Sequence, residues 1–168
     1  MGIQITNGEF TSFHGPDPTM VRTTADFTGA LRFVNCAFWG PTNRVAQLDG
    51  HGVVGFSDCS FMQWDNKRKG LYALHADSGS LIVRGCDFME DKPQIFLGAK
   101  VDRAVITDNL LNGKKRIKKA TKGTVVIKNN AETPDSPEWR EQLKKAPGFR
   151  SHSRREEAKA AAAAKQRH

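Results

Sequence analysis

VGFSDCSF (residues 54–61) and LIVRGCDF (residues 81–88) share one pattern of eight positions. Apolar residues occupy the first, third and eighth positions, a turn-forming residue the fifth, and cysteine the sixth. Four further segments align with these two without gaps: IQITNGEF (3–10), LRFVNCAF (31–38), AVITDNLL (104–111) and VVIKNNAE (125–132). Alternation of apolar and mostly polar residues has the period of a β-strand, so each copy predicts a strand. A pattern that returns every 21–28 residues indicates a repeat architecture.

The fifth position of the repeat predicts a sharp corner. Every residue there tolerates the left-handed backbone conformation: Asn7, Asn35, Asp58, Gly85, Asp108 and Asn129. No helical pattern separates the copies, which excludes βαβ units. We therefore expect coils of a parallel β-helix, in which equivalent residues stack about 4.8 Å apart.

A second, weaker series of strands lies between the copies, at RVAQLDG (44–50), GLYALHA (70–76) and QIFLGAK (94–100). In this series we expect Leu48, Leu74 and Leu97 to stack inward. Alternation then points the following residues outward on neighbouring coils: Gln47, Asp49, Ala73, His75, Phe96 and Gly98.

The turns N-C-A-F, D-C-S-F and G-C-D-F, followed by T-D-N-L and K-N-N-A, resemble the right-handed parallel β-helix of the pectin-lyase-like superfamily over about residues 3–132. The predicted fold is all-β, with about five to six coils over residues 1–133. A short capping helix (134–148) and a basic, alanine-rich tail (149–168), frayed or disordered, are expected to follow. The repeat already begins at Ile3, so we expect the C-terminal portion of a longer β-helix protein, or a chain that depends on further coils or on homo-oligomers.

Cys36, Cys59 and Cys86 all fall in the sixth, inward column. An odd number of cysteines excludes a closed disulfide set, and the absence of a C-x-x-C spacing argues against a zinc site. We expect a buried thiol ladder that Asn109 and Asn130 continue with their amides.

Two short strings match polygalacturonase motifs, G-H-G at residues 50–52 and R-I-K at residues 116–118. The carboxylate motifs of that family, N-T-D and D-D, are absent from the chain. Hydrolysis of a glycosidic bond needs a pair of carboxyl groups as acid and base or nucleophile, so these strings alone do not indicate a hydrolase.

A polysaccharide lyase would need a base near the sugar carbon, and Asp49 with His75 are the catalytic candidates on the outward strand face. The ligand-binding candidates are Gln47, His51, Trp39, Trp64, Tyr72 and Lys67. For the three aromatic residues, burial against the coil is the equal alternative. Calcium would require several converging oxygens, and Asp49 with Asp77 supplies few, so we expect no metal or cofactor.

The net charge of +8 resides entirely in the last third of the chain. Residues 1–113 hold 10 Lys and Arg against 12 Asp and Glu, whereas residues 114–168 hold 16 against 6. The segment KKRIKKATKG (114–123) is expected to form a basic loop between two coils. No base-reading motif accompanies the charge, and no apolar stretch is long enough for a membrane span, so neither specific nucleic-acid binding nor a membrane is expected.

The resemblance implies a polysaccharide partner and a secreted or cell-surface location, although the first residues lack the pattern of a signal peptide. We therefore expect a polysaccharide-associated module that is not catalytic alone. The alternatives are a lyase or glycoside hydrolase acting on uronate-containing glycans, and a structural solenoid of the tail-fibre or adhesin kind.

Overall fold

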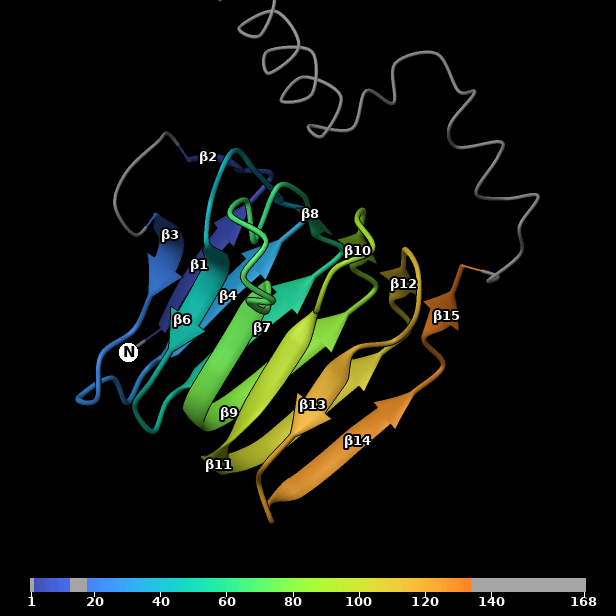
Figure 1. The fold of residues 1–168 in the computed structure, drawn as a ribbon. Helices are drawn as coiled ribbons and strands as arrows, with labels where there is room; N and C mark the ends of the chain where they lie inside the picture. The colour runs from blue at the N-terminus through green and yellow to red at the C-terminus, as the bar shows by residue number, and fades with distance from the viewer. Residues whose placement is uncertain (1, 13–17, 134–168) are drawn as a thin grey trace, which may run out of the picture. The chain divides into compact units, whose positions relative to one another are not determined.

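The computed structural model describes residues 2–12 and 18–133, and these residues form fifteen β-strands in two parallel sheets. The strands stack as a β-helix of about five turns, with no helix in the described part. Figure 1 shows the strands lying side by side in order along the stack, from β1 to β14. The predicted all-β solenoid is thus confirmed.

The nine-stranded sheet consists of two stacks that meet at a corner. One stack contains β1 (Gly2–Thr6), β4 (Ala30–Val34), β7 (Val53–Ser57) and β14 (Thr124–Lys128). The other contains β3 (Thr19–Arg22), β6 (Arg44–Leu48) and β13 (Ile117–Lys119). Two long strands, β9 (Leu74–Arg84) and β11 (Ile95–Thr107), contribute their first halves to the second stack and their later halves to the first.

The six-stranded sheet forms the third side of each coil. It contains β2 (Glu9–Thr11), β5 (Ala37–Trp39), β8 (Ser60–Phe61), β10 (Asp87–Phe88), β12 (Leu110–Leu111) and β15 (Ala131–Glu132). The register of the first stack and of the six-stranded sheet reproduces the alignment of the six copies, since Leu31 pairs with Val54, and Phe38 with Phe61.

A left-handed corner joins each strand of the first stack to the six-stranded sheet. The backbone φ angles are 55° at Asn7, 50° at Asn35, 54° at Asp58, 63° at Gly85, 60° at Asp108 and 55° at Asn129. At Gly85 a Cβ atom would lie 2.3 Å from Oδ1 of Asp58, so a side chain there would displace the neighbouring carboxylate. The six predicted corners are therefore confirmed.

Stacked phenylalanine rings fill the interior. Phe38, Phe61 and Phe88 are fully buried, and their ring centroids lie 5.6 Å and 4.8 Å apart in succession. A second row places Phe33 5.1 Å from Phe56. Because each coil contributes only a few inward side chains, a modest hydrophobic fraction is enough to build this core.

The sixth column forms the expected ladder of polar contacts. Cys36, Cys59 and Cys86 are free and buried, and the backbone N–H of Gly8 donates to Sγ of Cys36 at 3.4 Å. Further along, Oδ1 of Asn109 accepts from the backbone N–H of Cys86 at 2.9 Å, and Oδ1 of Asn130 accepts from that of Asn109 at 3.2 Å. The hydrogen bond with Cys59, and then burial, raise the pKa of the Cys86 thiol well above its usual value, so it stays protonated.

Three details differ from the predictions. Leu74 does not share a column with Leu48 and Leu97; it pairs with Ala46 and Ile95, while Ala76 fills the position between those two leucines. Ala73 and Gly98, both expected outward, are buried. The segment 114–123 is not wholly a loop, because β13 pairs with β11 inside it.

The chain divides into two units, Met1–Thr133 and Pro134–His168. The predicted capping helix and alanine-rich tail lie outside the described residues. Within the part of the chain that the structure describes, no helix has the length and apolar character needed to cross a membrane.

Candidate functional site

One outward column crosses five strands of the second stack. Arg22 on β3 pairs with Gln47 on β6, and Gln47 with His75 on β9. His75 in turn pairs with Phe96 on β11, and Phe96 with Lys118 on β13. Backbone pairing on five strands holds these side chains in one row, so their spacing follows the repeat of the sheet.

Asp77 is the polar centre of this row. Its Oδ2 accepts a hydrogen bond from Nε2 of Gln47 at 2.6 Å, and its Oδ1 lies 3.0 Å from Nε2 of His75. The side chain of Asp77 is 48 % exposed, whereas that of His75 is 19 % exposed. Nδ1 of His75 is buried without a hydrogen-bond partner among the described residues. Neither ring nitrogen of His75 is therefore directed freely into solvent.

Aromatic rings gather beside this polar centre. The ring centroid of Phe96 lies 4.5 Å from that of His75 and 5.6 Å from that of Tyr72. The ammonium of Lys118 lies 5.9 Å from the Phe96 centroid, within reach of a cation–π contact. We call Tyr72, His75, Phe96 and Lys118 the Phe96 platform. All four side chains are at least partly accessible, and three of them lie on strands of the sheet.

Asp49 lies at the turn after β6 and has its own partners. Its Oδ1 accepts from Oγ of Ser78 and from the backbone N–H of Gly50. The hydrogen bond from Ser78 is the main cause that holds the pKa of Asp49 below its usual value, and the Gly50 N–H adds to it. The structure thus pairs Asp49 with Ser78 and His75 with Asp77, and does not join the two catalytic candidates in one dyad.

The other predicted ligand-binding residues are spread over the molecule. Gln47 and Tyr72 lie at the platform, but Trp39 lies on β5 of the six-stranded sheet, where its Nε1 donates to Glu9. His51 is in the turn after β6, and Lys67 is in the segment after β8.

Trp64 is fully buried, as the alternative of packing against the coil requires. Its Nε1 donates to the carbonyl of Pro93 at 2.8 Å, and its ring lies edge-on to Phe88. Its ring therefore offers no stacking surface to a ligand.

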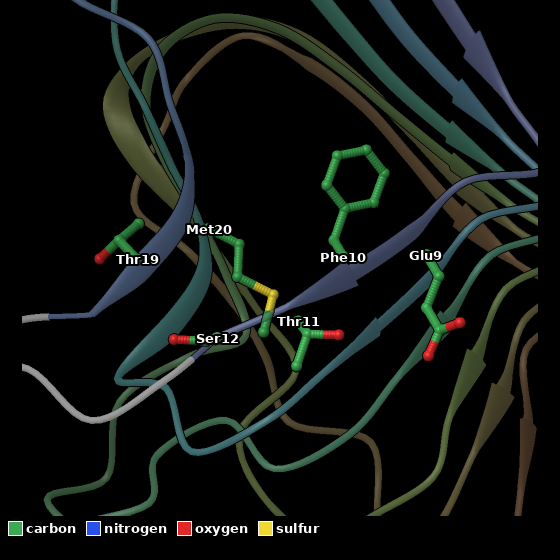
Figure 2. A pocket seen from close by; sticks show the side chains of 6 residues that line it. All are labelled: Glu9, Phe10, Thr11, Ser12, Thr19 and Met20. Carbon is green, nitrogen blue, oxygen red and sulfur yellow. The ribbon is translucent and has the colours of Figure 1, made fainter.

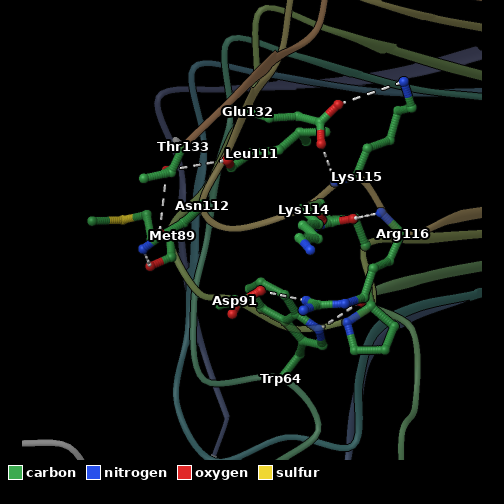
Figure 3. A network of polar contacts seen from close by, with 12 residues as sticks. Trp64, Met89, Asp91, Leu111, Asn112, Lys114, Lys115, Arg116, Glu132 and Thr133 are labelled. Carbon is green, nitrogen blue, oxygen red and sulfur yellow. Dashed lines mark hydrogen bonds and ion pairs between the residues drawn. The ribbon is translucent and has the colours of Figure 1, made fainter. Parts of the chain in front are cut away.

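The basic segment after β12 is partly neutralised by acids of neighbouring coils, as Figure 3 shows. Arg116 pairs with Asp91, and Glu132 accepts from the backbone N–H of Lys115 at 2.8 Å. This hydrogen bond is the main cause that lowers the pKa of Glu132. Gln94, fully buried, bonds the backbone of Arg116 through its Oε1. These contacts fix the segment to the solenoid and direct Lys118 onto the platform.

A cavity of about 400 Å³ opens at the first coil (Figure 2), lined by Glu9, Phe10, Thr11, Ser12, Thr19 and Met20. Glu9 is the ionisable residue of this lining, and its carboxylate already accepts from Trp39. The lining is thus a mixture of polar and apolar surface, and its described residues contain no cluster of ionisable groups.

Within residues 2–12 and 18–133, no three His, Cys, Asp or Glu side chains converge in a way that would hold a metal ion. Comparisons with family models, with curated proteins and with solved structures gave no match to this chain. The role proposed for the site therefore rests on its geometry.

Sequence reasoning did not nominate Phe96 and Lys118 as ligand-binding residues, and it considered Asp77 beside Asp49 and His75 without naming it as a site residue. Alternation already placed Phe96 outward beside His75, and Asp77 follows His75 by two residues, which puts both on one face of a strand. Lys118 had no such signal, because its strand was read as a loop.

Proposed function

We propose that this chain is a polysaccharide-binding β-helix module whose ligand packs on the Phe96 platform. The observation that carries the proposal is the contact of the Phe96 ring with His75, Tyr72 and Lys118 on the outer surface of a rigid parallel sheet. The platform combines apolar ring surface with polar edges, and sugars present the same combination.

The polar groups beside the platform suit sugar hydroxyls. Asp77 is nearly half exposed while it holds Gln47 and His75, so its carboxylate retains lone pairs for a further donor. Because backbone pairing positions His75 and Phe96, little side-chain entropy is lost when a ligand binds.

The geometry favours binding over catalysis. A general base needs a nitrogen or oxygen within hydrogen-bond reach of the substrate proton. His75 directs Nε2 to Asp77 and buries Nδ1, and Asp49 is occupied by Ser78 and Gly50. Lyase activity is therefore the alternative that the experiment distinguishes from binding.

The test is titration of the full chain with soluble polysaccharides, comprising polygalacturonate, its fully methyl-esterified form, alginate and xylan, by calorimetry. Phe96→Ala should weaken binding of the bound glycan by about tenfold or more, which corresponds to about 1.4 kcal/mol. Trp39→Ala removes an exposed ring from a different sheet and should leave the affinity unchanged.

Two results would contradict the proposal. Equal binding by Phe96→Ala and the parent chain would remove the platform from the site. Release of unsaturated sugar that is lost in His75→Ala would replace the binding module by a lyase.

A further inference from the structure

The outer surface of the first stack is separate from the platform and has a different character. We call this surface the arginine face; it is the outward side of β1, β4, β7, β14 and the later halves of β9 and β11. Its central column runs in register through Arg32, Gly55, Ile82, Val105 and Val126.

The arginine face carries cations on four of its six strands, β4, β9, β11 and β14. Arg84 on β9, Arg103 on β11 and Lys128 on β14 are exposed. Arg32 on β4 leans over the next coil, because a Cβ atom on Gly55 would lie 3.0 Å from Nη1 of Arg32. The glycine thus leaves space for the arginine, so β7, which carries no cation of its own, lies beneath the guanidinium of β4, and β9, β11 and β14 each contribute one further cation.

No acid balances these cations on the face itself. The outward positions of the six strands contain no Asp or Glu. Asp58 and Asp108 lie beyond the strand ends at the corners, and Asp102 lies at a register shift in β11. Among the described residues, none forms an ion pair with Arg32, Arg84, Arg103 or Lys128.

An apolar row lies between the charges. Ile82, Val105 and Val126 are neighbours in the central column, and Val105 and Val126 are 40 % and 38 % exposed. These side chains are short and β-branched, so the row is flat. Isolated exposed valines are ordinary, but a row of three β-branched side chains, flanked by cations that form no ion pair with another described residue, marks an interaction surface.

We infer that the arginine face binds an acidic polysaccharide, with carboxylates at the cations and sugar rings over the apolar row. This inference rests on the proposed polysaccharide-binding function and assigns a second surface to it. A linear polymer with a carboxylate on each sugar can reach cations on both sides of the apolar row, Arg103 on one side and Arg84 with Lys128 on the other. Guanidinium groups bind carboxylates through paired hydrogen bonds.

Other occupants fit the face less well. A second copy packed face to face would oppose arginine to arginine. A membrane surface would require Trp, Phe or Leu side chains that insert between lipids, and the row has short β-branched residues instead. An acidic protein shares the charge of the polysaccharide and is separated from it by the experiment.

The experiment compares polygalacturonate with its fully methyl-esterified form, using the full chain at several salt concentrations. Arg84→Gln/Arg103→Gln should weaken binding of the acidic polymer by about tenfold and reduce its salt dependence, because two ionic contacts are lost. Affinity for the esterified polymer should not change. Arg68→Gln/Lys69→Gln removes the same charge from the segment after β8 and serves as the matched control. Unfolding midpoints verify that both variants are folded.

A second variant tests whether the apolar row itself contacts the polymer. Val105→Glu places an anion in the middle of the row and should abolish binding of the acidic polymer while the esterified polymer still binds. Loss of binding in Phe96→Ala without any effect of the arginine and Val105 variants would overturn this inference and preserve the platform. The reverse pattern would preserve the inference and remove the platform.

The control double variant and an acidic polypeptide test whether net charge or an acidic protein, instead of an acidic polysaccharide on the arginine face, explains the binding. If Arg68→Gln/Lys69→Gln weakens binding as much as Arg84→Gln/Arg103→Gln, net charge rather than the face is responsible and the inference fails. If poly-L-glutamate binds as tightly as polygalacturonate and is equally sensitive to Val105→Glu, the partner is an acidic protein and the inference is also overturned.

Discussion

Asn109 shows how a single side chain can join three coils. Its amide is fully buried; Oδ1 accepts from the backbone of Cys86, and Nδ2 donates to the carbonyl of Val83 and to Oδ1 of Asn130. Cysteine fills the same column in three earlier coils, where Sγ contacts the backbone more weakly. At this position the interior tolerates a polar group because every polar atom of the group has a partner.

Asn109→Ala should therefore lower the free energy of unfolding by about 2–4 kcal/mol, because buried backbone groups of Cys86 and Val83 lose their partners. Asn112→Ala removes the bond to the carbonyl of Met89 and a long bond from Oγ1 of Thr133 at a more accessible position, and it should cost less than about 1 kcal/mol. Urea denaturation followed by circular dichroism measures both. Equal losses of unfolding free energy in the two variants would show that the buried ladder contributes no more to stability than an accessible side-chain hydrogen bond.

At the scale of elements, the repeat predicted the first stack and its corners well, because six aligned copies specify both faces of each strand. The second stack was predicted with one error of register. A shift of two residues along a strand keeps the same face inward, so alternation alone did not distinguish Leu74 from Ala76 as the partner of Leu48. Connecting segments have no periodicity, which explains why the direction of Trp64 could not be read from its neighbours. The candidate site was predicted only in part. The contact partners of its residues depend on which side chains the turns bring close together, and alternation along a strand does not specify them.

The phenylalanine rows allow a test of element packing. Phe61→Ala on β8 should cost about 3–5 kcal/mol, because its ring is buried among Phe38, Phe56 and Phe88. Phe96→Ala on β11 points outward and should cost less than half as much. Chemical denaturation of the two variants under one condition provides the comparison, and a larger loss for Phe96→Ala would contradict the assignment of inner and outer faces.

At the scale of the molecule, the strands of each described coil pair only with those of the neighbouring coils. Strands β1 and β14 pair on one side, with β4 and β11 respectively, whereas β9 pairs on both sides with β7 and β11. In such solenoids stability is close to a sum of coil and interface terms, so the first and last coils are held by fewer terms than the middle ones. The net charge is not distributed evenly over the coils, because the excess of Lys and Arg over Asp and Glu begins after residue 113.

Hydrogen exchange should follow this arrangement. Amides of β1 and β14 should exchange at least tenfold faster than those of β7 and the later half of β9, because end coils open locally without disturbing the centre. Mass spectrometry of peptides from the exchanged chain measures the difference. Uniform protection from β1 to β14 would indicate that the solenoid opens only as a whole.

The left-handed corners have a consequence for how such a chain can grow. Each corner follows its strand at the same position and leads to an inward side chain in the same column, while the segments elsewhere in the coil absorb the changes in length between 21 and 28 residues. A duplication that runs from one corner to the next adds a complete coil with its own phenylalanine and its own ladder residue. A duplication within a connecting segment changes only the length of that coil, whereas one that ends inside a strand misplaces the inward side chains of that strand. The corner thus marks the boundary of the repeating unit. Whole coils can be added or removed at these boundaries without the need for a new core.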